Sequence, residues 1–553
     1  MKSLNYLLAG ILLAGAAPEL SAQSSQYIFE GEVMQQASLS AEQIARLTQP
    51  QLYGTARSMA MANAFTSLGG DLASMNINPA GLGMFRNSEF GITPLVTSMN
   101  SSSNMADYGG NSKTRFGLAN LGMVYNVYEG SGGVISVNLG IGYNRIADLN
   151  YRTSFQYDGA AGSSSILDLM AGQLTANGLY PDKEGFLGYY GENYPDLWGA
   201  MMAYNAYLLN AYSDEQGPFW EADLLGENAR VGHFYDLESR GSIGEYDLSF
   251  GLNIDNKLYV GATIGIQSVY QKIDLYYGED YLYDGPAQLP GNLQADYMHY
   301  NQAAAVDGVG VNFKAGIIYR PLPALRIGLA VHTPTYYSLE HRYAGQMAAQ
   351  IYDNDRDRYS YSDVDTDGAW NDLGGDSYRF VSPTRLMVGA SYAFGSRAIV
   401  SVDYERDWYN GIRTKNFPFW VPDPSMYHRS AFKEKFCATN TLRIGAELKP
   451  LPRWALRAGY SYTSSMVRNR ELTESSPVAD KVTYWTAGMG FALSRRVTLD
   501  LAYQYCRTEN SDYRLYYSLE LPADGPAALI DTSEKITTDY TRHNMALSLS
   551  VKF

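Results

Sequence analysis

The sequence predicts an all-β fold: an antiparallel transmembrane β-barrel of about fourteen strands, plugged by its own N-terminal segment. Three observations lead to this prediction. From Glu89 onward, short segments alternate apolar and polar residues with a period of two. Short turns alternate with long polar segments along the same part of the chain. The chain also holds 47 Tyr, and tyrosine favours the boundary between membrane and water.

The first residues have the pattern of a secretory signal peptide. Lys2 gives a positive start, an apolar run follows at 6–17, and a cleavage site is expected after Ala22. We therefore expect residues 1–22 to be removed from the mature protein. Beyond them, no apolar run reaches the roughly 18 residues that a spanning helix needs, so the sequence predicts no such helix.

Residues 23–50 are predicted to form an N-terminal extension. Ser40 and Gln43 match a capping box, in which the side chain of each residue accepts a hydrogen bond from the backbone N–H of the other. The apolar residues that follow indicate a short helix. A simple linker is the alternative, because short isolated helices are marginal. The extension is expected on the periplasmic side, packed under the plug.

Residues 51–86 lack strand alternation and precede the first strand, so they are predicted to form the plug, or hatch. Glycines recur there and allow tight turns and close backbone approach; they are Gly54, Gly69, Gly70, Gly81 and Gly83. Pro79 restricts its own backbone and that of Asn78, while Ala80 is small. A surface turn before the first strand is the alternative interpretation.

Two parts of this segment, GTARSMAMANAF and LGGDLASMNINPAGLGMFR, resemble the N-terminal hatch of FadL/TodX-type outer-membrane transporters of long-chain fatty acids and other hydrophobic compounds. The triplet Asn78, Pro79 and Ala80 is the most specific part of the resemblance. The chain departs from the family at 60–63, where it has Ala60, Ala62 and Asn63 instead of the usual glycines. The resemblance implies a fourteen-stranded barrel and places Asn78, Pro79 and Ala80 on a gated substrate path.

Residues 87–553 are predicted to form the barrel. The last segment is the clearest strand, with Met545, Leu547 and Leu549 on one face and Asn544 and Ser548 on the other. In a barrel the apolar face meets lipid and the polar face lines the lumen. The terminal Phe553 resembles the end of the C-terminal targeting strand of bacterial outer-membrane proteins.

The connections agree with a barrel that has short periplasmic turns and long extracellular loops. Short turns are predicted at 129–133, 255–256, 321–323, 395–396, 450–452 and 494–495. The segment 150–240 is long enough to carry structure of its own, and two stretches within it look helical. We expect a cap outside the membrane. Its apolar residues either form the core of the cap or offer a landing groove for substrate.

Charged residues are predicted on the lumen face of several strands: Lys314, Arg326, Arg385, Asp403, Glu405, Arg443, Glu447, Arg457 and Asp500. Mixed charges on neighbouring strands indicate a hydrogen-bonded ladder that stiffens the wall. Alternatively, some of these arginines bind a substrate carboxylate.

Asp363, Asp365 and Asp367 match the first half of a calcium-binding loop. Position twelve of that loop is Gly374, which cannot supply the closing carboxylate, so a solvated acidic loop is the alternative. No other cofactor is expected. Short enzyme motifs such as GxSxG and HExxH are absent from the sequence, so we expect no enzymatic activity. Cys437 and Cys506 are expected to be free thiols.

The net charge of −15 argues against nucleic acid as a partner. The resemblance implies a monomer in the bacterial outer membrane, in contact with its lipids, that takes up small hydrophobic molecules passively, fatty acids among them. It also implies lateral exit into the bilayer, for which a strand kink is expected at Gly140 and Gly142. The alternative is a barrel without transport activity that binds protein partners in a secretion or assembly complex.

Overall fold

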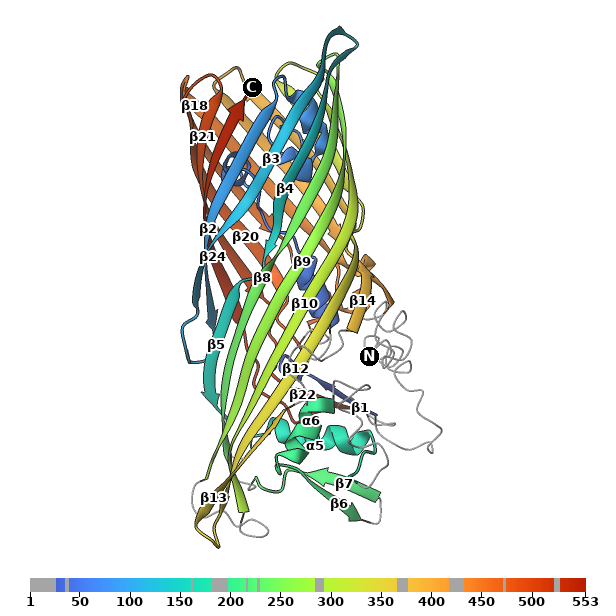
Figure 1. The fold of residues 1–553 in the computed structure, drawn as a ribbon, viewed down its shortest axis with the longest axis vertical. Coiled ribbons are helices and arrows are strands. Elements are labelled where there is room, and N and C mark those ends of the chain that lie inside the picture. Colours follow the sequence, from blue (N-terminus) through green and yellow to red (C-terminus); the bar gives the residue numbers. More distant parts are fainter. Residues whose placement is uncertain are drawn as a thin grey trace.

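A computed structural model of the chain describes residues 26–34, 39–160, 163–181, 197–214, 217–225, 229–283, 293–365, 376–416, 432–470, 474–521 and 528–553. A closed, antiparallel barrel of 14 strands dominates it, as predicted (Figure 1). Several wall strands are interrupted and therefore carry two labels. The wall comprises β2 (Glu89–Ser103), β3 (Ser112–Gly132), β4 (Val134–Asp148) with β5 (Tyr151–Asp158), β8 (Arg230–Ile254), β9 (Leu258–Leu282), β10 (Leu293–Tyr319), β11 (Leu325–His332) with β12 (Tyr336–Asp353), β14 (Asp376–Val381) with β15 (Arg385–Phe394), β16 (Ala398–Trp408) with β17 (Arg413–Asn416), β18 (Ala438–Leu451), β19 (Trp454–Thr463), β20 (Ala479–Ala492), β21 (Val497–Asn510) and β24 (Thr538–Lys552).

The inside and outside of the wall follow the predicted alternation. On β24, the outward residue Leu547 is 43% exposed, whereas its lumen-facing neighbour Ser548 is 2% exposed. Pairing of β24 with β2 closes the barrel. Among the described residues, no helix is long and apolar enough to cross a membrane.

All six predicted short turns lie at one end of the barrel, together with the C-terminus (Figure 1). The turn between β8 and β9 is typical: Asp255 and Asn256 have φ angles of 52° and 54°. Asn and Asp tolerate this left-handed conformation better than other non-glycine residues, and it suits a two-residue hairpin.

The other end of the barrel carries the long connections and a cap (Figure 1). The cap contains both predicted helices, whose apolar residues share one buried cluster. They therefore form the cap's own core rather than an open landing groove. The predicted cap boundaries were too wide, because β5 and the first residues of β8 belong to the wall. The described cap elements are α5 (Ile166–Ala176), α6 (Trp198–Asn205), β6 (Asn210–Asp214), β7 (Gly217–Glu221), β22 (Tyr517–Leu521) and β23 (Ala528–Ile530).

The N-terminal extension does not lie under the hatch, so the expected periplasmic position is wrong. Its first strand, β1 (Gln26–Glu30), pairs with β22 in the cap. The predicted helix is present as α2 (Ala41–Leu47), with both hydrogen bonds of the capping box. The capping box predicts the helix but not the end of the barrel at which the helix lies. Buried apolar residues of α2 pack against lumen-facing residues near the long-loop end, which include Tyr378, Phe432 and Val478.

The hatch fills the lumen at the short-turn end with three short helices: α3 (Ala56–Ala60), α4 (Ser74–Ile77) and the 3-10 helix η2 (Pro79–Met84). Between α3 and α4, Ala62 and Asn63 have φ angles of 52° and 53°. These are two of the positions at which the chain departs from the family's glycines, so the backbone turns left-handed there without glycine.

Cys437 and Cys506 are both free thiols, as expected.

Candidate functional site: a window in the barrel wall and the cavity behind it

The wall is interrupted between β3 and the strand formed by β4 and β5. From the short-turn end, β3 pairs with β4 as far as Asn120 and Asn144. Beyond that point, β3 pairs only with β2 on its other side, while the continuing strand follows β8. A bulge lies between Arg145 and Ala147, and the strand breaks before Tyr151. The result is a window in the wall.

The predicted kink at Gly140 and Gly142 is not where the wall separates. Both residues keep their β3 partners, Val124 and Gly122. A Cβ atom at Gly140 would lie 2.9 Å from the sulfur of Met75 in the hatch. These glycines therefore make room for α4, and the strand departs only past Asn144.

The window opens into a cavity of about 370 Å³. Phe116 of β3, Tyr270 of β9 and Ser242 of β8 contribute to its lining. Phe116 and Tyr270 are exposed on the outer surface of the barrel, so the opening adjoins the apolar outer belt.

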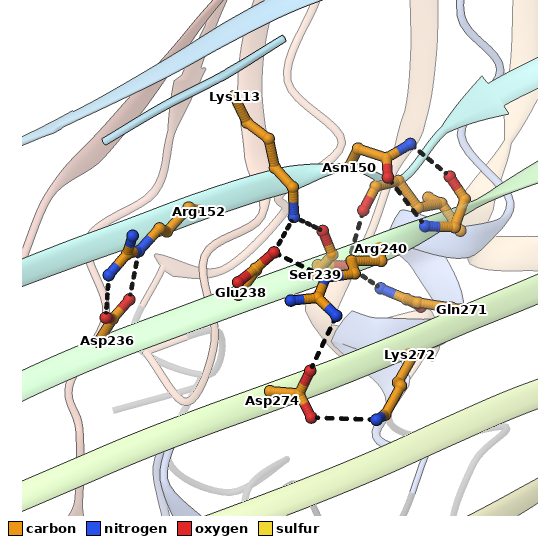
Figure 2. Close-up of polar contacts among 12 residues, drawn as sticks. Lys113, Asn150, Arg152, Asp236, Glu238, Ser239, Arg240, Gln271, Lys272 and Asp274 are labelled. Carbon is orange, nitrogen blue, oxygen red and sulfur yellow. Dashed lines mark hydrogen bonds and ion pairs between the residues drawn. The ribbon is translucent and has the colours of Figure 1, made fainter. Parts of the chain in front are cut away.

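A row of charged side chains borders the window on the long-loop side (Figure 2). Lys113 of β3 reaches across to β8, where its ammonium group donates to the backbone carbonyl of Ser239 (3.2 Å) and contacts Glu238. Arg240 pairs with Glu238 at 2.7 Å, and Arg152 of β5 donates to Asp236 at 2.9 Å. Among these contacts, those of Lys113 link β3 to β8 across the opening, whereas β5 and β8 are already paired at this level.

The inner side of the window is sealed by Gln51, the first residue of the predicted hatch segment. Its backbone N–H donates to the carbonyl of Ile146 (2.9 Å), and its side-chain amide donates to the carbonyl of Asp148 (3.1 Å). In return, the N–H of Asp148 donates to the Gln51 side-chain oxygen (3.0 Å). Gln51 thus satisfies backbone groups that lost their strand partner at the bulge.

Arg145 lies in the wall between the lumen and the outer opening. It lines both the window cavity and a second cavity beside the hatch. Its guanidinium group donates to the carbonyl of Leu118 on β3 (3.2 Å) and forms an ion pair with Asp148 (2.6 Å). Because Leu118 lies at the unpaired edge of β3, Arg145 also fills the place of a missing strand contact.

Behind the seal lies a lumen cavity of about 110 Å³. Apolar residues such as Leu149, Ile273 and Val482 line it, together with Arg46 and Arg542. A cavity of about 150 Å³ holds one benzene molecule. This cavity is therefore too small for an extended acyl chain unless the N-terminal segment moves.

Lumen charges predicted from the sequence form ladders around the hatch. The ion pairs are Lys314 with Glu245 and, at 3.2 Å, Asp247; Arg385 with Asp407 at 3.0 Å; Arg443 with Glu405 at 2.8 Å; and Arg457 with Glu447 at 2.7 Å and Asp500 at 2.6 Å. Asp403 accepts from the backbone N–H of Thr66 at 2.7 Å, and Arg326 donates to the carbonyl of Leu68 at 2.7 Å. Hatch residue Arg57 also pairs with Glu447 at 3.1 Å. These contacts fix the hatch to the wall.

Asn78, Pro79 and Ala80 lie against the wall strands β9 to β11. The Asn78 side chain donates to the carbonyl of Thr66 (2.6 Å) and accepts from the N–H of Ala80 (3.1 Å). A Cβ atom at Gly261 would lie 2.2 Å from the carbonyl carbon of Pro79. The triplet is therefore an anchor, held by local hydrogen bonds and by direct backbone contact with the wall.

A buried carboxylate attaches the cap to the barrel beyond the membrane-facing belt. Glu279 of β9 accepts from the N–H of Ile166 (2.9 Å), at the N-terminus of α5. It also accepts from the hydroxyls of Ser165, Tyr277 and Tyr281. Burial raises the pKa of Glu279 to about 7.

Asp363 and Asp365 lie on β13 (Arg358–Asp365), which pairs with β12 beyond the barrel wall. Asp363 accepts from Gln346 at 2.9 Å. Asp367 and Gly374 lie outside the described residues. In the described part of the chain, no group of three or more potential metal-binding side chains occurs, and calcium binding stays a prediction.

A family model described as "Outer membrane protein transport protein (OMPP1/FadL/TodX)" matches residues 241–515. The chain belongs to the FadL/TodX type. It is accordingly a transport-family β-barrel of the bacterial outer membrane. No curated protein sequence matches the chain.

Solved structures of FadL/TodX proteins share the fold. A Pseudomonas aeruginosa FadL homologue superposes with a TM-score of 0.51 at 11% identity, over 91% of this chain and 99% of the homologue. The deltaS2 mutant of the TodX monoaromatic hydrocarbon channel gives 0.51 at 16% identity, over 90% and 98%. The Pseudomonas putida toluene transporter TodX gives 0.48 at 14% identity, over 91% and 99%.

Proposed function

We propose that the protein passes small hydrophobic molecules inward across the outer membrane without an energy source, and that they leave sideways through the window. The window carries this proposal, because it joins the region of the lumen cavity to the apolar outer surface of the barrel. A lateral exit suits an apolar molecule, since the molecule need not cross water. The family match and the fold shared with the TodX monoaromatic hydrocarbon channel support this substrate class.

We further propose that the hatch segment gates the window through its first residue. Gln51 occupies the inner side of the opening and holds the bulged strand by three hydrogen bonds. Movement of residues 49–53 would open the window and enlarge the small lumen cavity at the same time. Long-chain fatty acids would need this movement, whereas a single-ring compound would need less.

The test is to fill the window and measure transport. Ser242 lines the window, and Ser268 on β9 also faces outward but does not line it. In proteoliposomes, Ser242→Trp should reduce uptake of toluene and of a long-chain fatty acid, and Ser268→Trp should leave both unchanged. Equal uptake in the two variants would exclude the window as the exit. Absence of uptake by the parent protein would favour a role in binding protein partners.

A further inference from the structure

The outer mouth of the window lies at the boundary between the apolar belt and the extracellular part of the wall. Along β9, the outward-facing residues are uncharged up to Tyr270, and the next two in the same alternation are Lys272 and Asp274. From Val260 to Tyr270 a strand tilted by about 40° rises about 25 Å, which is the height of the apolar belt of such barrels. The headgroups of the outer leaflet therefore lie at the level of the window.

The window cavity is strongly cationic. Four basic side chains line it, but only one acidic side chain does: Arg115, Arg145, Arg240 and Lys272, with Asp148. Asp148 pairs with Arg145 at 2.6 Å. The other three cations therefore have no acidic partner inside the cavity.

Outside the cavity, the charges of these three cations are only weakly compensated. Arg240 pairs with Glu238 at 2.7 Å, and Lys272 pairs with Asp274 at 3.5 Å (Figure 2). These side chains are partly exposed, and ion pairs in contact with water contribute little. Arg115 is exposed and forms no ion pair with an acid among the described residues. An anion in the mouth would consequently find three available positive charges.

Apolar side chains border the mouth on its membrane side. Phe116 is 79% exposed, and its partner in the β2–β3 ladder, Val96, is also exposed. On β8, exposed Tyr246 and Leu248 follow Ser242 of the window toward the short-turn end. An occupant of the mouth would therefore have its charged group among cations and its apolar part against an apolar surface. A membrane lipid has this arrangement.

We infer that the mouth of the window binds the phosphate group of a lipid of the outer leaflet, whose acyl chains lie along the apolar surface around Phe116. Clusters of Lys and Arg beside a membrane attract anionic headgroups. A phosphate group carries up to two negative charges and three acceptor oxygens, so it can engage Arg115, Arg240 and Lys272 together. A carboxylate has only two oxygens, and one guanidinium group occupies both in a bidentate pair. The site is reached from the bilayer, and the inference does not rest on the proposed transport function.

The experiment measures lipid binding to the full-length protein in a nonionic detergent. Native mass spectrometry gives the apparent Kd for bisphosphorylated lipid A and for its dephosphorylated form, and the parent should bind the phosphorylated form at least tenfold more tightly. Arg115→Gln and Lys272→Gln should each weaken that binding by about fivefold, the factor expected for one basic residue beside an anionic headgroup. The double variant should weaken it by about 25-fold. Binding of the dephosphorylated form should be the same in all variants.

Arg406→Gln is the matched control. Arg406 follows Tyr404 in the outward alternation of β16, as Lys272 follows Tyr270 on β9, but β16 lies on the opposite side of the barrel. This variant should bind both forms of lipid A like the parent. An equal loss of binding in Arg406→Gln would indicate general attraction to the barrel surface and would overturn the site. Arg115→Lys keeps the charge, so it should lose less affinity than Arg115→Gln.

Competitors identify the occupant. A lipid phosphate held also by its acyl chains should resist displacement by equimolar inorganic phosphate or palmitate. Displacement by inorganic phosphate would assign the mouth to a free ion, displacement by palmitate would assign it to a carboxylate, and either result would overturn the inference. Equal affinity of the parent for the two forms of lipid A, or unchanged affinity in the double variant, would overturn it as well. These readouts are independent of uptake, so a failure of the proposed transport function is seen separately in the proteoliposome assay.

Discussion

Replacing Gly261 by Ala should move the hatch while leaving the barrel wall intact. A Cβ atom at this position would lie 2.2 Å from the Pro79 carbonyl carbon and 2.5 Å from the Ala80 backbone nitrogen. Ordinary contact begins near 3.4 Å, so the hatch backbone must retreat by about 1 Å. These neighbours are backbone atoms that no side-chain rotation can move aside. Overpacking of this kind typically costs about 1–3 kcal/mol.

The wall should tolerate the change, because the backbone of β9 pairs with β8 and β10 on both sides at this level. A closed barrel does not need the plug to satisfy its backbone hydrogen bonds. We therefore expect Gly261→Ala to keep its surface abundance and its cooperative barrel unfolding. Hydrogen exchange in residues 77–84 should rise, and so should the ion conductance of the protein in planar bilayers.

Gly132→Ala is the matched control, since a Cβ atom at Gly132 meets nothing within 4 Å. It should behave like the parent in every assay. If Gly261→Ala also shows parental exchange and conductance, Pro79 does not rest on β9 in the membrane, and the anchoring role of the triplet is refuted. If the variant fails to assemble, the hatch is part of the folding core.

Other predictions test the wall, the C-terminus and the cap. Leu547→Arg should destabilise the barrel by about 2–4 kcal/mol, because it puts a charge on the lipid face near mid-membrane. Thr541→Arg, on the same face but beside the charged pair of Arg507 and Asp539, should cost about 0–1 kcal/mol. Reversible unfolding in vesicles measures both, and equal costs would contradict the deeper position of Leu547 in the membrane. Deleting Phe553, whose N–H donates to the Ser88 carbonyl at 2.9 Å, should lower the heat-modifiable fraction in outer membranes, whereas unchanged levels would argue against its role in assembly. The raised pKa of Glu279, about 7, predicts that its contribution to cap stability is complete below its ordinary value of 4.5 and is lost as pH rises through 7, by up to about 3 kcal/mol. The hydrogen-exchange protection factors of α5, which are corrected for the intrinsic pH dependence of exchange, should therefore fall between pH 5 and about pH 8, and Glu279→Gln should remove this fall; a persisting fall would assign it to another group.

The alternation of the wall could be predicted because lipid and lumen impose opposite demands on neighbouring residues. On β24, that rule alone predicts that Leu547 faces outward and that Ser548 faces the lumen. The turn at Asp255 and Asn256 could also be predicted, because it depends only on the tolerance of these two residues for the left-handed backbone conformation. The capping box at Ser40 and Gln43 predicted α2 for the same reason. Its position on the long-loop side depends on distant partners, such as Phe432, which no local signal reveals.

The window was not predictable from glycine content. Gly140 and Gly142 suggested a kink, but their small size serves contact with Met75. The wall separates at Arg145 to Asn150, where polar side chains replace strand pairing. Gln51 was placed in the hatch segment from the sequence, but its position at the window depends on Ile146 and Asp148, which lie almost 100 residues further along the chain.

The hatch segment is held unequally along its length, and this decides which part can move. From Arg57 onward it is fixed by the ion pair of Arg57 with Glu447, by Asp403 and by backbone contact between Pro79 and Gly261. Gln51, in contrast, is held only by hydrogen bonds, and those with Arg542 and Asp148 share one side-chain oxygen. Regions with few contacts open at lower free energy than the rest of a fold. A gate at Gln51 can therefore open while Asn78 stays in place, so Asn78→Ala should affect hatch anchoring more than substrate exit.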